Sequence, residues 1–312
     1  MNETDALHKS IGQVILGKDD VIELILICLV TQGHILIEDV PGVGKTTLAL
    51  SLAKSIDGTF QRIQFTSDLL PSDVIGVPIY NSKTHGFEFK PGPIFANVVL
   101  ADEINRTTPK TQSALLEAMQ DGHVTVDRVT HELEKPFMVV ATQNPTEFHG
   151  TYPLPESQLD RFMMRITMGY PSKEEEARIL QNRGSSQIAY LKPVCDAKKI
   201  LELQHAASKV RVDDSITKYI LELVDKTRKT KDLELGVSPR GALSLHRAVQ
   251  GKALIHGRDF VIPDDVKDLA LPVLSHRLIV SGQKSSTRTS YGVRTISQEI
   301  LQEIINSTEV PM

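Results

Sequence analysis

A glycine-rich segment between an apolar run and a helical pattern constrains this chain more than any other feature. The segment reads DVPGVGKTT from Asp39 to Thr47 and follows the apolar run 34–38. Its glycines let the backbone turn tightly, so that several N–H groups can point at phosphate oxygens, and the N-terminus of the next helix adds partial positive charge. Because a strand precedes the segment and a helix over 45–55 follows it, the pattern predicts a P-loop rather than a chance turn.

The side chains of this loop indicate ATP as the ligand and Mg²⁺ as its metal. We predict that the Lys45 ammonium reaches the β- and γ-phosphates and that the Thr46 hydroxyl binds Mg²⁺. The full motif has glycine where this chain has Asp39; that position starts the loop without contacting the terminal phosphates, so the departure is tolerable. The predicted nucleotide-binding residues of the loop are Pro41, Gly42, Val43, Gly44, Lys45, Thr46 and Thr47.

The first half of the chain is typical of an α/β protein with a parallel sheet. Short apolar runs alternate with helical patterns, which predicts consecutive βαβ units. The run 98–102 is fully apolar until it ends in acids, as expected for a parallel strand buried on both faces. The predicted strands are 34–38, 60–66, 98–102, 137–142 and 162–168.

Two inserts and a change of character near residue 171 complete the organisation. The inserts 68–95 and 123–134 each carry a hairpin pattern. After Ser172, which can cap a helix, helical patterns dominate. We predict a P-loop NTPase sheet flanked by helices in residues 1–170, followed by a helical lid domain in residues 171–312.

Two acids at the end of the third strand predict the metal and the general base. Asp102 and Glu103 follow an apolar run, so they stand at the carboxyl edge of a parallel sheet, where ligands bind. We predict that Asp102 holds Mg²⁺, either directly or through a water molecule, and that Glu103 polarises the attacking water. The alternative is that the two acids only mark a strand end exposed to solvent. Their distance in the sequence behind the P-loop favours a role in the nucleotide site.

Three further polar residues are candidates for the catalytic set. Asn144 follows the fourth strand and could orient the attacking water, or could simply begin a turn. Arg161 could stabilise transition-state charge, or could pair with Asp160. Arg240 lies in the first turn of a helix that Ser238 can cap, where it could meet an anion if this domain covers the P-loop, or could be solvated.

The segment before the first long helix is a candidate adenine contact. Ile15 and Gly17 lie in the short run VILG. An apolar segment here could pack on the base, and core packing is an alternative.

Composition and charge set broad limits on function. Of the 312 residues, 40% are hydrophobic and 24% are charged, and the formal net charge of −4 gives no general attraction to nucleic acid or anionic membrane. The most apolar run, 21–30, is too short to span a bilayer and contains Glu23. The N-terminus lacks the pattern of a signal peptide, so we expect a cytoplasmic protein without a transmembrane segment. The polar stretch 281–290 is expected to be a loop.

These motifs together resemble the AAA+ superfamily of ATPases, and within it the MoxR family of the helix-2-insert clade. The segments EDVPGVGKTTLA, LADEINRTTPKTQSALLEAMQ, ATQNP, YPLPESQLDRF and VSPRG carry the resemblance, which covers about residues 15–277. The resemblance implies that Arg161 is an arginine finger acting on a neighbouring subunit, with Arg106 a further interface candidate. It implies that Asn144 is sensor 1 and that Arg240 is sensor 2.

The resemblance also implies how such a chain works. Proteins of this kind form homo-oligomeric, usually hexameric rings with ATP at the subunit interfaces. MoxR proteins are similar to chaperones and commonly act with a partner that carries a von Willebrand factor A-type domain. We therefore expect an ATPase that remodels or matures a protein client, with ATP and Mg²⁺ as cofactors.

Three alternatives remain open at the level of the sequence. One is a nucleotide-dependent binding scaffold with little turnover, although Glu103, Asn144 and Arg161 argue against it. Another is a motor on nucleic acid, which the mild negative charge and the lack of an appended DNA-binding motif disfavour. The last is a chelatase-type ATPase subunit. Because the sequence has no Cys/His cluster, such a subunit is not expected to hold the metal itself.

Overall fold

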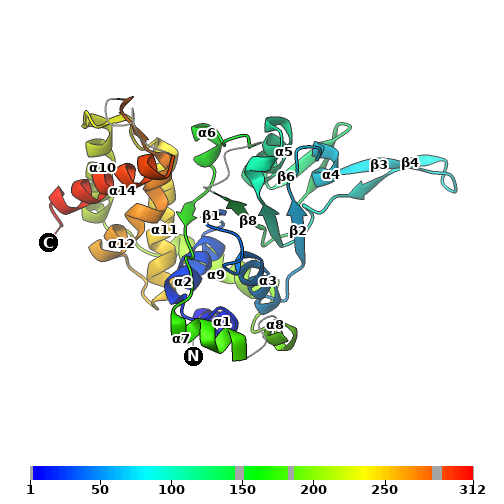
Figure 1. The fold of residues 1–312 in the computed structure, drawn as a ribbon, viewed down its shortest axis with the longest axis horizontal. Coiled ribbons are helices and arrows are strands. Elements are labelled where there is room, and N and C mark those ends of the chain that lie inside the picture. Colours follow the sequence, from blue (N-terminus) through cyan, green and yellow to red (C-terminus); the bar gives the residue numbers. More distant parts are fainter. Residues whose placement is uncertain (1–2, 145–150, 182–185, 283–289, 312) are drawn as a thin grey trace.

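A five-stranded parallel sheet organises the first half of the chain (Figure 1). The computed structural model describes residues 3–144, 151–181, 186–282 and 290–311. The strand order is β2-β5-β8-β1-β9, and every neighbouring pair is parallel. The strands are β1 (Ile35–Glu38), β2 (Phe60–Gln64), β5 (Val98–Asp102), β8 (Met138–Gln143) and β9 (Met164–Ile166).

Each predicted strand is present, and the burial pattern explains why the central ones were recognisable. β1, β5 and β8 are buried along almost their whole length, so both of their faces are apolar. β2 lies at an edge of the sheet, and Ile63 is the one fully buried residue of this strand. It ends at Gln64, two residues before the predicted end, although the Phe65 N–H still donates to the Asp102 carbonyl at 2.9 Å.

Helices cover both faces of this sheet. One hydrophobic cluster contains Leu36, Val99 and Val139 together with Leu115 of α5. A second cluster contains Ile37 together with buried residues of α2 and α3. Successive residues of a strand point to opposite faces, which is why one strand serves both clusters. The helices of this half are α1 (Glu3–Gly12), α2 (Asp19–Val30), α3 (Lys45–Ser55), α4 (Pro71–Ile75), the short 3₁₀ turn η1 (Ile104–Arg106), α5 (Pro109–Asp121) and α6 (Glu156–Leu159).

The two inserts are hairpins, as predicted. β3 (Gly76–Asn81) pairs with β4 (Gly86–Pro91), and this ribbon projects from the body of the molecule (Figure 1). β6 (His123–Val126) pairs with β7 (Val129–Glu132). The second hairpin turns at Asp127 and Arg128, whose φ angles of 49° and 70° suit a two-residue hairpin loop. The hairpins touch where the His131 ring stacks on Phe89, with centroids 3.9 Å apart.

The chain after the sheet first packs back on the N-terminal helices. Ser172 caps α7 as predicted, because its hydroxyl accepts the Glu175 N–H at 3.2 Å. The Gln204 side chain of α9 donates to the Leu29 carbonyl of α2 at 2.8 Å. The division between domains at residues 170 and 171 stays a prediction. The elements of this stretch are α7 (Lys173–Gln181), α8 (Ser186–Tyr190) and α9 (Ala197–Lys209).

Helices and one small sheet form the remainder of the chain. The predicted cap of α11 is confirmed, because the Ser238 hydroxyl accepts the Gly241 N–H at 3.0 Å and Pro239 follows it. Within the predicted loop 281–290, residues 283–289 lie outside the described residues. The elements are α10 (Asp214–Lys229), β10 (Leu233–Leu235), α11 (Pro239–Ile255), α12 (Pro263–Leu274), η2 (Ser275–Arg277), β11 (Ile279–Val280) and α14 (Ser290–Ser307).

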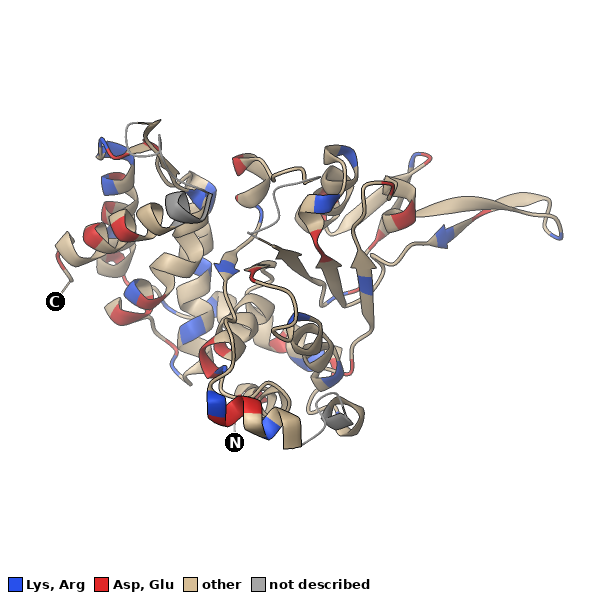
Figure 2. Cartoon of the chain, in the orientation of Figure 1, with Lys and Arg blue, Asp and Glu red and all other residues tan. Residues whose placement is uncertain are grey.

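Basic and acidic residues are intermixed along the helices of both halves (Figure 2). None of the described helices combines the length and the apolar character that crossing a bilayer requires.

Candidate nucleotide-binding site

The predicted P-loop connects β1 to α3, as the sequence indicated. Gly42 and Gly44 have φ angles of 86° and 98°, which a side chain would strain. Gly44 is the N-cap of α3, and its carbonyl accepts the Leu48 N–H at 2.9 Å. The first-turn N–H groups of a helix have no partner inside the helix, so the start of α3 offers donors and partial positive charge to an anion.

A cavity of about 380 Å³ opens at this loop and gathers most of the predicted site. Residues from β2, β5 and the end of β8 join the loop around it. Val43 packs instead against the hydrophobic core. The cavity is lined by Pro41, Gly42, Gly44, Lys45, Thr46, Thr47, Arg62, Gln64, Asp102, Glu103 and Asn144.

Lys45 is already held inside the loop. Its ammonium donates to the Asp39 carbonyl at 2.7 Å. Burial lowers the pKa of Lys45, while the nearby carboxylates of Asp39, Asp102 and Glu103 oppose that shift. A partly desolvated ammonium beside the N-terminus of α3 is suited to a phosphate.

Asp39 has a structural role that its sequence position did not reveal. One carboxylate oxygen accepts the N–H groups of Met168 and Gly169 at 2.7 and 2.6 Å, and the other accepts the Val40 N–H at 2.8 Å. The loop is thereby fastened to the segment that follows β9. The residue that departs from the glycine of the motif therefore anchors the loop.

Asp102 uses both carboxylate oxygens within the protein. The Thr142 hydroxyl donates to Oδ1 at 2.6 Å. The Arg62 guanidinium donates to Oδ2 from Nη2 at 2.6 Å and from Nε at 3.1 Å. Neither Thr142 nor Arg62 was identified from the sequence as a partner of Asp102. A signal for Arg62 was its charge in the predicted strand 60–66, because this strand pairs with the strand that ends at Asp102.

Glu103 is held in a specific orientation. Its backbone lies in the left-handed region, with a φ of 58°, and its N–H donates to the Thr142 hydroxyl at 2.9 Å. The carboxylate accepts from Gln64 Nε2 at 2.9 Å and pairs with Arg106 Nε at 3.2 Å. Arg106 therefore contacts Glu103 of its own chain. The conformation aims the carboxylate into the cavity beside Asp102.

The remaining candidates differ in whether they line the cavity. Asn144 is buried and lines the cavity. Arg161 donates instead to the Leu116 carbonyl at 2.6 Å. Arg240 lies 3.9 Å from the Asp160 carboxylate and is half exposed. Neither arginine is among the described residues that line the cavity of the same chain.

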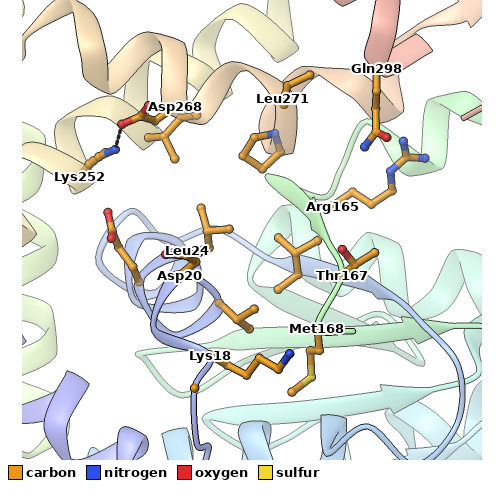
Figure 3. A pocket seen from close by; sticks show the side chains of 16 residues that line it. Lys18, Asp20, Leu24, Arg165, Thr167, Met168, Lys252, Asp268, Leu271 and Gln298 are labelled. Carbon is orange, nitrogen blue, oxygen red and sulfur yellow. Dashed lines mark hydrogen bonds and ion pairs between the residues drawn. The ribbon is translucent and has the colours of Figure 1, made fainter. Parts of the chain in front are cut away.

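The two residues predicted to contact adenine are not among the described residues that line the P-loop cavity. Ile15 lies in the hydrophobic core, as the alternative interpretation expected. Gly17 lines a second cavity of about 640 Å³, between α2, β9, α11, α12 and α14. In Figure 3, Lys18 and Met168 lie on one side of this cavity, opposite Asp268 and Leu271 on α12.

The residues of the smaller cavity fit a triphosphate with Mg²⁺. The set combines an ammonium, a guanidinium, two hydroxyls, two carboxylates and a helix N-terminus on one concave surface. Oxygen ligands are those that Mg²⁺ prefers, and a helix N-terminus favours phosphate. Asp102 and Thr46 would hold the metal, and Lys45 would hold the phosphates.

The fold and this site define the AAA+ class of P-loop ATPases: a β2-β5-β8-β1-β9 parallel sheet, a P-loop after β1 and an acidic pair after β5. Residues 34–164 match the ATPase family associated with various cellular activities (AAA), and residues 225–304 match the AAA lid domain.

Comparisons with individual proteins narrow the class to one family. The chain is 42% identical to Chaperone MoxR1 of Mycobacterium tuberculosis, over 89% of this chain and 77% of that protein. It is 52% identical to the uncharacterized protein YeaC of Bacillus subtilis, over 97% of this chain and 93% of that protein. A solved structure of a candidate ATPase from Cytophaga hutchinsonii superposes with a TM-score of 0.90 at 40% identity, over 100% and 96% of the two chains. This chain belongs to the MoxR family of AAA+ ATPases.

Proposed function

We propose that this chain binds Mg²⁺–ATP at the P-loop cavity and hydrolyses it to drive remodelling or maturation of a protein client. The observation that supports the proposal most directly is the convergence of Lys45, Thr46, Asp102, Glu103 and Asn144 on one cavity. The relative MoxR1 is named a chaperone, which supports a protein client for this chain.

The arrangement assigns a task to each side chain. Lys45 and the start of α3 would hold the phosphates, because they supply positive charge in a partly desolvated cavity. Mg²⁺ would neutralise charge that develops on the phosphate oxygens. Glu103 would accept a proton from the attacking water, and Asn144 would orient that water.

Arg161 and Arg240 lie outside the cavity of their own chain, which supports action on a neighbour's nucleotide or a rearrangement of the lid. The proposal therefore includes a homo-oligomeric ring, expected to be hexameric. From the resemblance to MoxR proteins alone, it also includes a partner with a von Willebrand factor A-type domain. It also includes a cytoplasmic location and no direct binding of nucleic acid.

Nucleotide binding is tested by calorimetry on the parent protein and on Lys45→Ala with Mg²⁺ present. We expect affinity for ATP in the parent and its loss in the variant. Folded parent protein without Lys45-dependent affinity would end the proposal.

Hydrolysis is tested by steady-state phosphate release from Glu103→Gln. Because a general base contributes roughly 10²–10⁴-fold, we expect a fall of about 100-fold or more. The control is Glu117→Gln on the exposed side of α5, which should keep the parent rate. Equal rates in Glu103→Gln and the parent would remove Glu103 from the mechanism.

Action between subunits is tested by mixing Arg161→Ala with Lys45→Ala. A Lys45→Ala subunit cannot bind ATP but can offer Arg161 to a neighbour with an intact loop. Recovery of phosphate release in the mixture would support action in trans, and its absence at every ratio would contradict it.

A further inference from the structure

The guanidinium of Arg62 binds the carboxylate of Asp102, the group that is assigned to Mg²⁺. Arg62 Nη2 and Nε lie 2.6 and 3.1 Å from Asp102 Oδ2. Arg62 is paired in the sheet with Leu100, two residues before Asp102, so its side chain extends along the strands toward the cavity. The Asp102 side chain is only 14% exposed, which makes this contact stronger than an ion pair in open solvent.

The guanidinium and a metal ion cannot both stay this close to Asp102. The other carboxylate oxygen already accepts the Thr142 hydroxyl at 2.6 Å, which fixes the orientation of the group. A divalent cation arriving at Oδ2 would meet a positive charge at contact distance, and like charges at such a distance repel strongly outside bulk water. Direct contact between a metal ion and Oδ2 therefore requires that Arg62 move.

Arg62 is also connected to the predicted general base. Its Nη2 donates to Gln64 Oε1 at 2.8 Å, and Gln64 Nε2 donates to the Glu103 carboxylate at 2.9 Å. Movement of Arg62 would remove one partner from Gln64. The carboxylates assigned to the metal and to the base are thus joined through two side chains of β2.

We propose that Arg62 is the internal counter-cation of Asp102 and that Mg²⁺ must displace it when nucleotide is loaded. This inference rests on the proposed function, because it concerns the same cavity. Before the metal arrives, Arg62 neutralises Asp102 and so reduces its repulsion of a triphosphate.

Displacement of Arg62 by Mg²⁺ predicts how nucleotide affinity depends on the metal. The metal enhancement, defined as the ratio of nucleotide affinities with and without Mg²⁺, is reduced by a cation that competes for Asp102. Removing that cation should weaken binding of metal-free nucleotide and raise the enhancement. A residue with a merely structural role would change both affinities by similar factors.

The test measures binding of a fluorescent non-hydrolysable ATP analogue with Mg²⁺ and with EDTA. In Arg62→Met, we expect the metal enhancement to rise about two- to fivefold, the range that a half-exposed ion pair of up to about 1 kcal/mol allows. Arg62→Lys keeps the charge and should stay near the parent value. Lys110→Met removes an exposed cation at the start of α5 and should also leave the enhancement near the parent value.

The outcomes separate this inference from the proposed function. If the parent binds the analogue through Lys45 and Arg62→Met shows the parent enhancement, the displacement is wrong while the ATP site stands. An equal rise in Lys110→Met would likewise overturn it, because the effect would then come from general charge. If the parent does not bind the analogue, the proposed function itself fails. Should Arg62→Met not fold, Arg62→Gln gives the same comparison.

Discussion

At the scale of single residues, a threonine that the sequence did not single out holds the acidic pair in place. The Thr142 hydroxyl donates to the Asp102 carboxylate and accepts the Glu103 N–H. Its one proton and two lone pairs satisfy both neighbours at once. The left-handed backbone at Glu103, which an ordinary residue adopts at some strain, is supported by this contact.

We expect Thr142→Val to lower both the stability and the activity of the protein. Valine has nearly the same shape but leaves the Glu103 N–H and the Asp102 oxygen without this partner, a loss of about 1–3 kcal/mol in the free energy of unfolding. Urea unfolding and phosphate release measure the two effects. Thr142→Ser retains the hydroxyl and should behave like the parent. Parent values in Thr142→Val would show that the hydroxyl does not support the pair.

A buried histidine gives the molecule a defined response to acid. His34 lies between the Met119 carbonyl, 2.9 Å from Nε2, and the Val139 N–H, 3.0 Å from Nδ1. The carbonyl can only accept and the N–H can only donate, so the neutral ring carries its proton on Nε2. Burial lowers the pKa of His34 from 6.5 to about 4.

Stability should therefore fall as the pH falls through the range 6.5 to 4. In that range the unfolded chain binds a proton at His34 and the folded chain does not, so unfolding is favoured by acid. The full shift corresponds to about 3 kcal/mol in the free energy of unfolding. Urea unfolding at pH 7 and pH 4.5 should show a smaller acid loss in His34→Asn than in the parent. His85→Asn, at an exposed position, should keep the parent's pH dependence; an unchanged acid loss in His34→Asn would contradict the assignment.

At the scale of elements, the start of α11 depends on one serine that also faces another segment. The Ser238 hydroxyl accepts the Gly241 N–H at 3.0 Å and lies 3.2 and 3.1 Å from the two oxygens of the Asp160 carboxylate. The cap was predictable, because Ser-Pro before a helical pattern is a local signal. The contact with Asp160 was not, because it joins residues 78 positions apart.

We expect Ser238→Ala to cost about 1 kcal/mol in the free energy of unfolding from the lost cap. Asparagine can cap the helix with its oxygen and donate to Asp160 with its nitrogen, so Ser238→Asn should restore most of the loss. Aspartate can cap but would repel Asp160, so Ser238→Asp should be less stable than Ser238→Asn. Equal stability of the Asn and Asp variants would exclude the contact with Asp160.

At the scale of the whole molecule, Arg277 fastens the C-terminal helices to the end of the sheet. Its side chain is only 2% exposed. Nε donates to Asp160 Oδ1 at 2.8 Å, and Nη2 donates to the Phe162 carbonyl at 2.7 Å. Asp160 also meets Ser238 and Arg240, so one carboxylate gathers three groups from the helical part of the chain.

We expect Arg277→Met to destabilise the protein by about 3–5 kcal/mol, because it leaves Asp160 without its buried partner. Asp160→Asn combined with Arg277→Met should lose less than the sum of the two single variants. Denaturant unfolding measures each value. Lys229→Met, at an exposed ion pair with Asp225, is the control and should show little change. Strict additivity of the double variant would contradict direct coupling.

The sequence by itself determined the class of the fold and most of the residues that line the P-loop cavity. The P-loop, the apolar strands, the acidic pair and both hairpins are encoded in segments of a few residues, where backbone geometry and periodicity act locally. The long-range polar contacts, both in the site and elsewhere, were decided only by the tertiary structure. Asp102 meets Arg62 across 40 positions, Asp39 meets Met168 across 129, and Asp160 meets Arg277 across 117. A polar side chain finds such partners only after the sheet and helices have fixed its surroundings, because hydrogen bonds and ion pairs depend on distance in space.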